Sequence, residues 1–130
     1  GSPDKSALKS ALKHLGSGGS IVIFPEGTRS RTGSLISVKK GFILLVKLAK
    51  VPVVPIALEG TEIVLPINDN DMAGEKLHRA RVTVKIGEPF TLPAKNEQPG
   101  DEDWEEICAT YSMKKIAAML EPKYRGVYGN

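Results

Sequence analysis

The feature that most constrains the fold is a pair of β-branched apolar runs with an apolar helix pattern between them. Residues 20–24 form a continuous apolar run, which is typical of a strand buried on both faces. Pro25 ends that run, and residues 39–50 are apolar nearly all round, which predicts a buried helix. Residues 53–58 lie in a second β-branched run. This order predicts a parallel βαβ unit with a right-handed crossover, the helix lying over strands 20–24 and 53–58.

The flanking segments complete the prediction of an α/β fold. Residues 4–15 carry an apolar stripe opposite three lysines and predict an amphipathic helix. Residues 81–86 alternate strictly and predict a strand with one wet face, after a connection over 61–80. Residues 101–120 predict a last helix. Caps and turns are expected at Asp4 or Ser2, Gly16, Asn68–Asp71, Gly74, Asp101 and Asp103.

Composition limits the classes of protein that fit. A length of 130 residues allows one domain, which we place at residues 3–130 because Gly1 and Ser2 look like a cloning scar. The net charge of +3 with 5% aromatic residues gives no nucleic-acid pattern, so we expect no nucleic-acid partner. Cys108 is the single cysteine, which excludes an intrachain disulfide and predicts a small core residue in a reducing compartment. Without a signal peptide or an apolar run of about 18 residues, we expect a soluble chain that does not span a membrane.

Chemistry is concentrated in a polar loop at the end of the first predicted strand. In open α/β sheets, ligands bind outside the carboxyl ends of strands, and Gly27 allows the backbone to approach a ligand closely. Glu26 can accept a hydrogen bond from a substrate hydroxyl, and Arg29 offers a fork of donors that matches phosphate. Lys39, at the start of the predicted helix, also favours an anion. These residues predict a pocket for a small phosphorylated polyol; the alternative is a surface loop closed by a Glu26–Arg29 pair.

Three sequence blocks in this region carry a family resemblance. Residues 24–30 read Phe-Pro-Glu-Gly-Thr-Arg-Ser, residues 39–41 read Lys-Lys-Gly, and residues 51–56 read Val-Pro-Val-Val-Pro-Ile. In this order and spacing, they resemble the lysophosphatidic acid acyltransferase family, the glycerolipid acyltransferases with a plsC-type domain. The resemblance covers roughly residues 5–90 and implies a partial glycerol-3-phosphate acyltransferase-like fold, with this chain as the C-terminal part of the domain.

By that resemblance, the acceptor site includes Glu26, Gly27, Thr28 and Arg29, with Arg29 on the phosphate, and Lys39 is a weaker member. Pro52 and Pro55 either shape the pocket floor near the acyl chain or order a strand edge.

The implied activity is transfer of a fatty acyl group from acyl-CoA or acyl-carrier protein to 1-acylglycerol 3-phosphate or a related acceptor. No cofactor and no metal is implied. The implied location of the parent protein is the cytoplasmic side of a membrane, which it meets through segments outside this chain.

The catalytic motif of the family, His-x-x-x-x-Asp, has no match. Five residues after His14 stands Gly19, and five after His78 stands Thr83, and neither histidine has metal-ligand spacing. We therefore expect a chain that begins after the motif, contains no catalytic residue and is inactive alone, with both histidines solvated. Bare apolar faces would then favour self-association. The alternative function is a non-catalytic module for anion binding or assembly.

Overall fold

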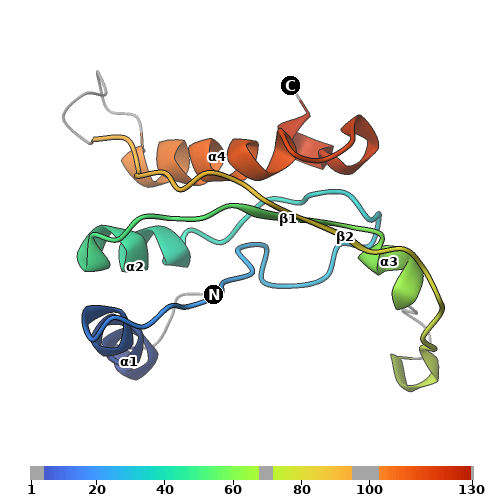
Figure 1. Ribbon diagram of the computed structural model, residues 1–130, viewed down its shortest axis with the longest axis horizontal. Helices are drawn as coiled ribbons and strands as arrows, with labels where there is room; N and C mark the ends of the chain where they lie inside the picture. The colour runs from blue at the N-terminus through green and yellow to red at the C-terminus, as the bar shows by residue number, and fades with distance from the viewer. Residues whose placement is uncertain (1–4, 68–71, 95–102, 130) are drawn as a thin grey trace.

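The computed structural model describes residues 5–67, 72–94 and 103–129, and it combines helices with a small sheet (Figure 1). This mixture is compatible with the predicted α/β class. The elements are, in order, α1 (Lys5–Gly16), α2 (Gly41–Ala49), β1 (Ile56–Glu59), α3 (Thr61–Val64), η1 (Met72–Gly74), β2 (Thr83–Ile86), α4 (Trp104–Ala117), η3 (Pro122–Tyr124) and η4 (Gly126–Tyr128).

The sheet is a two-stranded antiparallel ribbon. β1 pairs with β2 from Ile56 opposite Ile86 to Glu59 opposite Thr83. An isolated antiparallel bridge between Val53 and Phe90 prolongs the pairing. The strands predicted at 53–58 and 81–86 are therefore confirmed as extended segments, with bounds shifted by a few residues.

The prediction of a parallel βαβ unit is wrong. Residues 20–24 form no strand, and β1 takes β2 as its antiparallel partner instead. An apolar run becomes a strand only where a neighbouring strand satisfies its backbone groups, and no such neighbour lies beside residues 20–24 in the described ranges. Val22 and Phe24 are accordingly 75% and 72% exposed.

The core lies between α2 and α4. Ile43 packs with Cys108 and Ala109 of α4, and further buried side chains continue along α4, including Met113. Cys108 is fully buried, which confirms its predicted place in the core. The prediction of a buried helix holds for only part of α2, because Ile43 and Leu45 are buried whereas Leu48 is 48% exposed.

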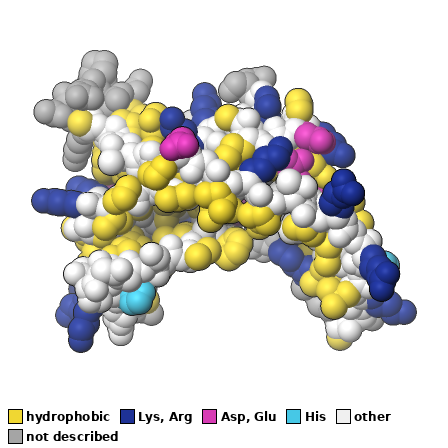
Figure 2. Space-filling view, viewed as in Figure 1, with side chains coloured by type: hydrophobic (Ala, Val, Ile, Leu, Met, Phe, Trp, Pro, Cys, Tyr) yellow, Lys and Arg dark blue, Asp and Glu magenta, His cyan; other side chains and the backbone are white. Residues whose placement is uncertain are grey.

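Each face of the ribbon has a different environment. Ala57 of β1 is buried, and Lys85 Nζ on the same face donates a 2.8 Å hydrogen bond to the carbonyl of Met119, just past the end of α4. The opposite face is apolar and is exposed as well. All four residues of β2 are exposed, so the prediction of a single wet face on this strand is wrong. Figure 2 shows hydrophobic side chains across the middle of the molecule, where Figure 1 places the ribbon. This exposed ribbon face consists of Ile56, Leu58, Val84 and Ile86.

The terminal helices follow the sequence closely. α1 ends at Gly16 as predicted, although none of its residues is fully buried. Asp103 caps α4 through its side chain, which accepts hydrogen bonds from the backbone of Glu105 and Glu106 at 3.0 and 3.4 Å. Among the described residues, no helix has the length and apolar character that crossing a membrane requires. The predicted caps and turns at Ser2, Asp4, Asn68–Asp71 and Asp101 lie outside the described residues.

Candidate substrate-binding site

The loop that carries the sequence motif is held at its base by backbone bonds and one carboxylate. Glu26 Oε2 accepts a 2.9 Å hydrogen bond from the N–H of Ile36, and the N–H of Lys39 donates to the carbonyl of Pro25 at 2.9 Å. The Glu26 side chain is therefore committed in part to the loop itself. Its predicted role toward a substrate hydroxyl stays a prediction.

The C-terminal segment ties down the middle of the same loop. The N–H of Leu35 donates to the carbonyl of Tyr124 at 2.9 Å, and Ser34 Oγ donates to the carbonyl of Lys123 at 2.8 Å. Tyr124 in turn donates its phenol proton to Glu62 Oε1 at 2.8 Å. Sequence reasoning did not anticipate this connection, because residues 122–128 carry no periodic pattern and no motif.

Gly27 and Lys39 are brought together by the turn. Gly27 has a φ of +74°, and its N–H donates to the carbonyl of Phe24 at 3.0 Å. A Cβ atom at this position would lie 3.3 Å from Cγ of Lys39. The left-handed backbone therefore favours glycine here, and an added Cβ atom would also make the stem of Lys39 shift slightly.

Arg29 is engaged with a carboxylate that the sequence did not indicate. Its Nη2 donates to Glu75 Oε1 and Oε2 at 2.9 and 2.8 Å, and its Nη1 donates to the carbonyl of Leu65 at 3.3 Å. The alternative of a loop closed by a Glu26–Arg29 pair is therefore wrong, because the partner of Arg29 is Glu75. Thr28, the remaining predicted site residue, is exposed at the surface of the loop.

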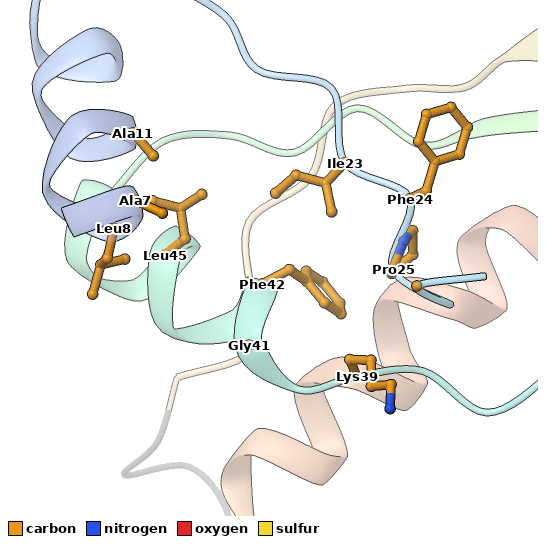
Figure 3. Close-up of a pocket in the computed structure, with 11 residues that line it drawn as sticks. Ala7, Leu8, Ala11, Ile23, Phe24, Pro25, Lys39, Gly41, Phe42 and Leu45 are labelled. Atoms are coloured by element: carbon orange, nitrogen blue, oxygen red, sulfur yellow. The ribbon is translucent and has the colours of Figure 1, made fainter. Parts of the chain in front are cut away.

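Next to the loop lies a mostly apolar hollow of about 380 Å³ between α1, α2 and residues 23–27 (Figure 3). Lys39 stands at its edge with its amine directed away from α1, while the ring of Phe42 points toward Pro25. The hollow is lined by Ala7, Leu8, Ala11, Ile23, Phe24, Pro25, Gly27, Lys39, Gly41, Phe42 and Leu45. The contribution of α1 was missed, although its apolar stripe was the available signal. Arg29 does not belong to this lining, so the predicted site residues divide between two places.

Pro52 and Pro55 also lie away from this hollow. Pro52 is exposed, whereas Pro55 is buried and its carbonyl accepts a 2.9 Å hydrogen bond from the N–H of Gly87. Of the two predicted roles for these prolines, the ordering of a strand edge is the one that this geometry supports.

Lys40, within the predicted Lys-Lys-Gly block, links α2 to α4. Its Nζ lies 2.6 Å from Asp103 Oδ2 and 3.0 Å from Glu106 Oε2. Hydrogen bonds to these carboxylates raise the pKa of Lys40 above its usual range and lower the pKa of Asp103. Lys40 is thus a structural contact, and Lys39 remains the candidate for anion binding.

Both histidines are exposed, as predicted. His14 Nε2 lies 3.1 Å from the carbonyl oxygen of Ser20, which fixes the turn after α1. Within the described ranges, no group of three or more His, Cys, Asp or Glu residues is placed to hold a metal ion.

Comparison with known proteins adds independent findings. The sequence profile of the Acyltransferase family matches residues 2–59. A 1-acyl-sn-glycerol-3-phosphate acyltransferase of Cocos nucifera is 36% identical over 100 residues, which are 77% of this chain and 28% of that protein. A chloroplastic relative of the same name from Arabidopsis thaliana is 39% identical over 83 residues, or 64% of this chain and 22% of the relative.

A further relative with this name, from Bacillus subtilis (strain 168), is 32% identical over 89 residues, or 68% of this chain and 39% of the relative. No solved structure matches the chain. The chain spans well under half the length of these relatives. The profile match contains the Phe-Pro-Glu-Gly-Thr-Arg-Ser block at residues 24–30. On this evidence the chain belongs to the acyltransferase family and carries part of its domain.

Proposed function

We propose that this chain is part of an enzyme of glycerophospholipid biosynthesis that transfers a fatty acyl group to 1-acylglycerol 3-phosphate. The observation that carries the proposal is the motif loop: Glu26 and the C-terminal segment hold it, and it presents Arg29 at the surface with its side chain 42% exposed. The relatives named above are 1-acyl-sn-glycerol-3-phosphate acyltransferases, and this supports the choice of acceptor. The acyl donor is acyl-CoA or acyl-carrier protein, and the enzyme needs no cofactor.

In this proposal, Arg29 contacts the acceptor phosphate, and Glu26, Gly27, Thr28 and Lys39 complete the acceptor site. Phosphate suits Arg29 because a guanidinium presents several donors in one plane. The apolar hollow beside Lys39 suits the hydrocarbon part of a lipid, because its lining is largely aliphatic and aromatic. The enzyme acts at the cytoplasmic side of a membrane and has a partial glycerol-3-phosphate acyltransferase-like fold in this region.

The chain alone is inactive in this proposal. Acyl transfer to a hydroxyl needs a general base, which typically contributes about 10²–10⁴-fold in rate. Neither His14 nor His78 has an aspartate at the spacing of the family motif.

The decisive experiment compares acyl transfer by the complete parent protein and by residues 1–130. The parent should transfer an acyl group to 1-acylglycerol 3-phosphate, and this chain should not. In the parent, Arg29→Ala should lower kcat/KM by at least tenfold, whereas Arg79→Ala, which removes an exposed arginine outside the loop, should not. A parent that transfers no acyl group would refute the proposed function. Turnover by residues 1–130 alone would refute the inactivity of this chain, and an Arg29→Ala parent with full activity would refute the role of Arg29.

A non-catalytic assembly module is the second candidate, and the exposed ribbon face favours it. Val84 and Ile86 are 56% and 70% exposed, and exposed apolar patches commonly mark interaction surfaces. We propose that the chain self-associates through this face. Sedimentation velocity should show oligomers that Val84→Lys removes and that Thr83→Lys, on the opposite face of the same strand, preserves. A monomer at high concentration would exclude self-association.

A further inference from the structure

The guanidinium of Arg29 is already paired with an anionic side chain of the chain itself. One of its nitrogens lies between the two oxygens of Glu75, at 2.9 and 2.8 Å, and a second nitrogen donates to the carbonyl of Leu65. A carboxylate and a phosphate both accept hydrogen bonds from the same planar set of guanidinium donors. The carboxylate of Glu75 therefore stands where an incoming phosphate would seek its contacts.

Exposure of the two side chains differs sharply. Glu75 is 7% exposed, whereas Arg29 is 42% exposed. Arg29 is thus reached from solvent, whereas the side chain of Glu75 is largely shielded from water. An ion pair with one shielded member is stronger than an exposed pair, so it competes effectively with a ligand.

We propose that Glu75 is an internal anion for Arg29, which occupies the guanidinium while the acceptor site is empty and is displaced when the acceptor phosphate binds. The inference rests on the proposed function, because it takes Arg29 as the phosphate contact. It adds a residue that sets how tightly the site binds its acceptor. The affinity for phosphate is the intrinsic affinity of Arg29 reduced by the strength of its pair with Glu75.

A small hollow beside Glu75 makes the exchange physically reasonable. Its volume is about 220 Å³, and its walls include Glu75, Lys76 and His78. A displaced carboxylate has room there next to the ammonium group of Lys76. An anion that enters this space instead would meet Lys76 and His78, which line it.

The test is a calorimetric titration of the chain with inorganic phosphate and, separately, with sn-glycerol 3-phosphate. Glu75→Gln replaces the carboxylate with a neutral group of the same shape, and hydrogen bonds to charged partners are roughly twice as strong as neutral ones. We expect this variant to bind both ligands about tenfold more tightly than the wild type. The double variant Arg29→Ala/Glu75→Gln should lose the gain.

Glu59→Gln is the matched control. Glu59 is 12% exposed and pairs with Lys85 at 2.9 Å, so this change removes the same charge from a comparable pair. It should leave phosphate affinity unchanged. Equal gains from both glutamine variants would mean that overall charge, and not the Arg29 contact, sets the affinity. Affinity that is unchanged or weaker in Glu75→Gln would mean that Glu75 positions Arg29, and would overturn the proposal.

Circular dichroism would reveal whether Glu75→Gln unfolds. In that case, a second measurement on the wild-type chain tests the proposal without the variant. On addition of phosphate, the side-chain NMR signals of Arg29 and the carboxyl carbon of Glu75 should shift together. Phosphate that shifts Arg29 without moving Glu75, or that moves neither signal, overturns the proposal. These titrations involve no acyl transfer, so an inactive parent would refute the proposed function and leave the exchange at Arg29 standing.

Discussion

The carboxylate of Glu26 accepts a 2.9 Å hydrogen bond from the backbone N–H of Ile36, across the width of the motif loop. Half-buried donors left without a partner are costly, so Glu26→Ala should lower the free energy of unfolding by about 1–3 kcal/mol. Glu26→Gln keeps an oxygen at the same place and should lose less. Urea unfolding followed by circular dichroism compares the two variants, and equal losses would contradict a role for this bond.

Gly126 should be intolerant of a side chain. Its φ of +53° disfavours other residues, and a Cβ atom there would collide with the carbonyl oxygen of Leu35. Gly126→Ala should therefore destabilise the chain by about 1–3 kcal/mol. The control is Gly16→Ala at the end of α1, where the added carbon meets no atom outside its own helix turn and neighbouring residues within 4 Å. It should leave the melting temperature within a degree or two of the wild type. A tolerated Gly126→Ala would count against the close approach.

The thiol of Cys108 should be inert in the folded chain. It has no exposed surface, and burial raises its pKa, which lowers the thiolate fraction near neutral pH. A thiol-reactive dye should label Cys108 only as fast as the molecule opens, and denaturant should bring labelling to completion. Rapid labelling without denaturant would show that the core between α2 and α4 is open.

Tyr124 should make stability fall at high pH. Its hydrogen bond to Glu62 raises the pKa of the phenol above the usual 10.0, so the folded state favours the protonated form. The contribution is fully present below pH 10 and is lost as pH rises through the raised pKa. Urea midpoints measured from about pH 8 to pH 11 should fall more steeply for the wild type than for Tyr124→Phe. Parallel curves would rule out this contribution.

Sequence reasoning predicted the helices well because their signals are local. α1 and α4 follow from stripes and caps that lie within the helices themselves, as the side chain of Asp103 illustrates. The prediction of the parallel βαβ unit was wrong because an apolar run indicates a tendency to be buried. It does not indicate which strand will be its neighbour. Val22 and Phe24 have the composition of a core strand, yet they remain exposed where the described residues supply no cover.

For the candidate site, the sequence predicted the motif loop but not the residues that pack against it. The motif at residues 24–30 located the loop, and the glycine at position 27 does adopt the backbone for which glycine is needed. Glu75 escaped detection because it stands 46 residues from Arg29, and a single carboxylate in a polar connection has no pattern that assigns its partner. The hollow was missed for a similar reason, since the approach of α1 to α2 is a matter of tertiary packing.

The backbone hydrogen bonds between Leu35 and the C-terminal segment also affect the local opening of the molecule. The amide of Leu35 donates to Tyr124, and the amide of Val127 donates back to Leu35 at 3.4 Å. Hydrogen-exchange protection arises in cooperative units whose members open together. Leu35 should thus exchange its amide proton at the same rate as residues 124 and 127. The deuterium uptake of the motif loop would then be set by how often the C-terminal segment opens.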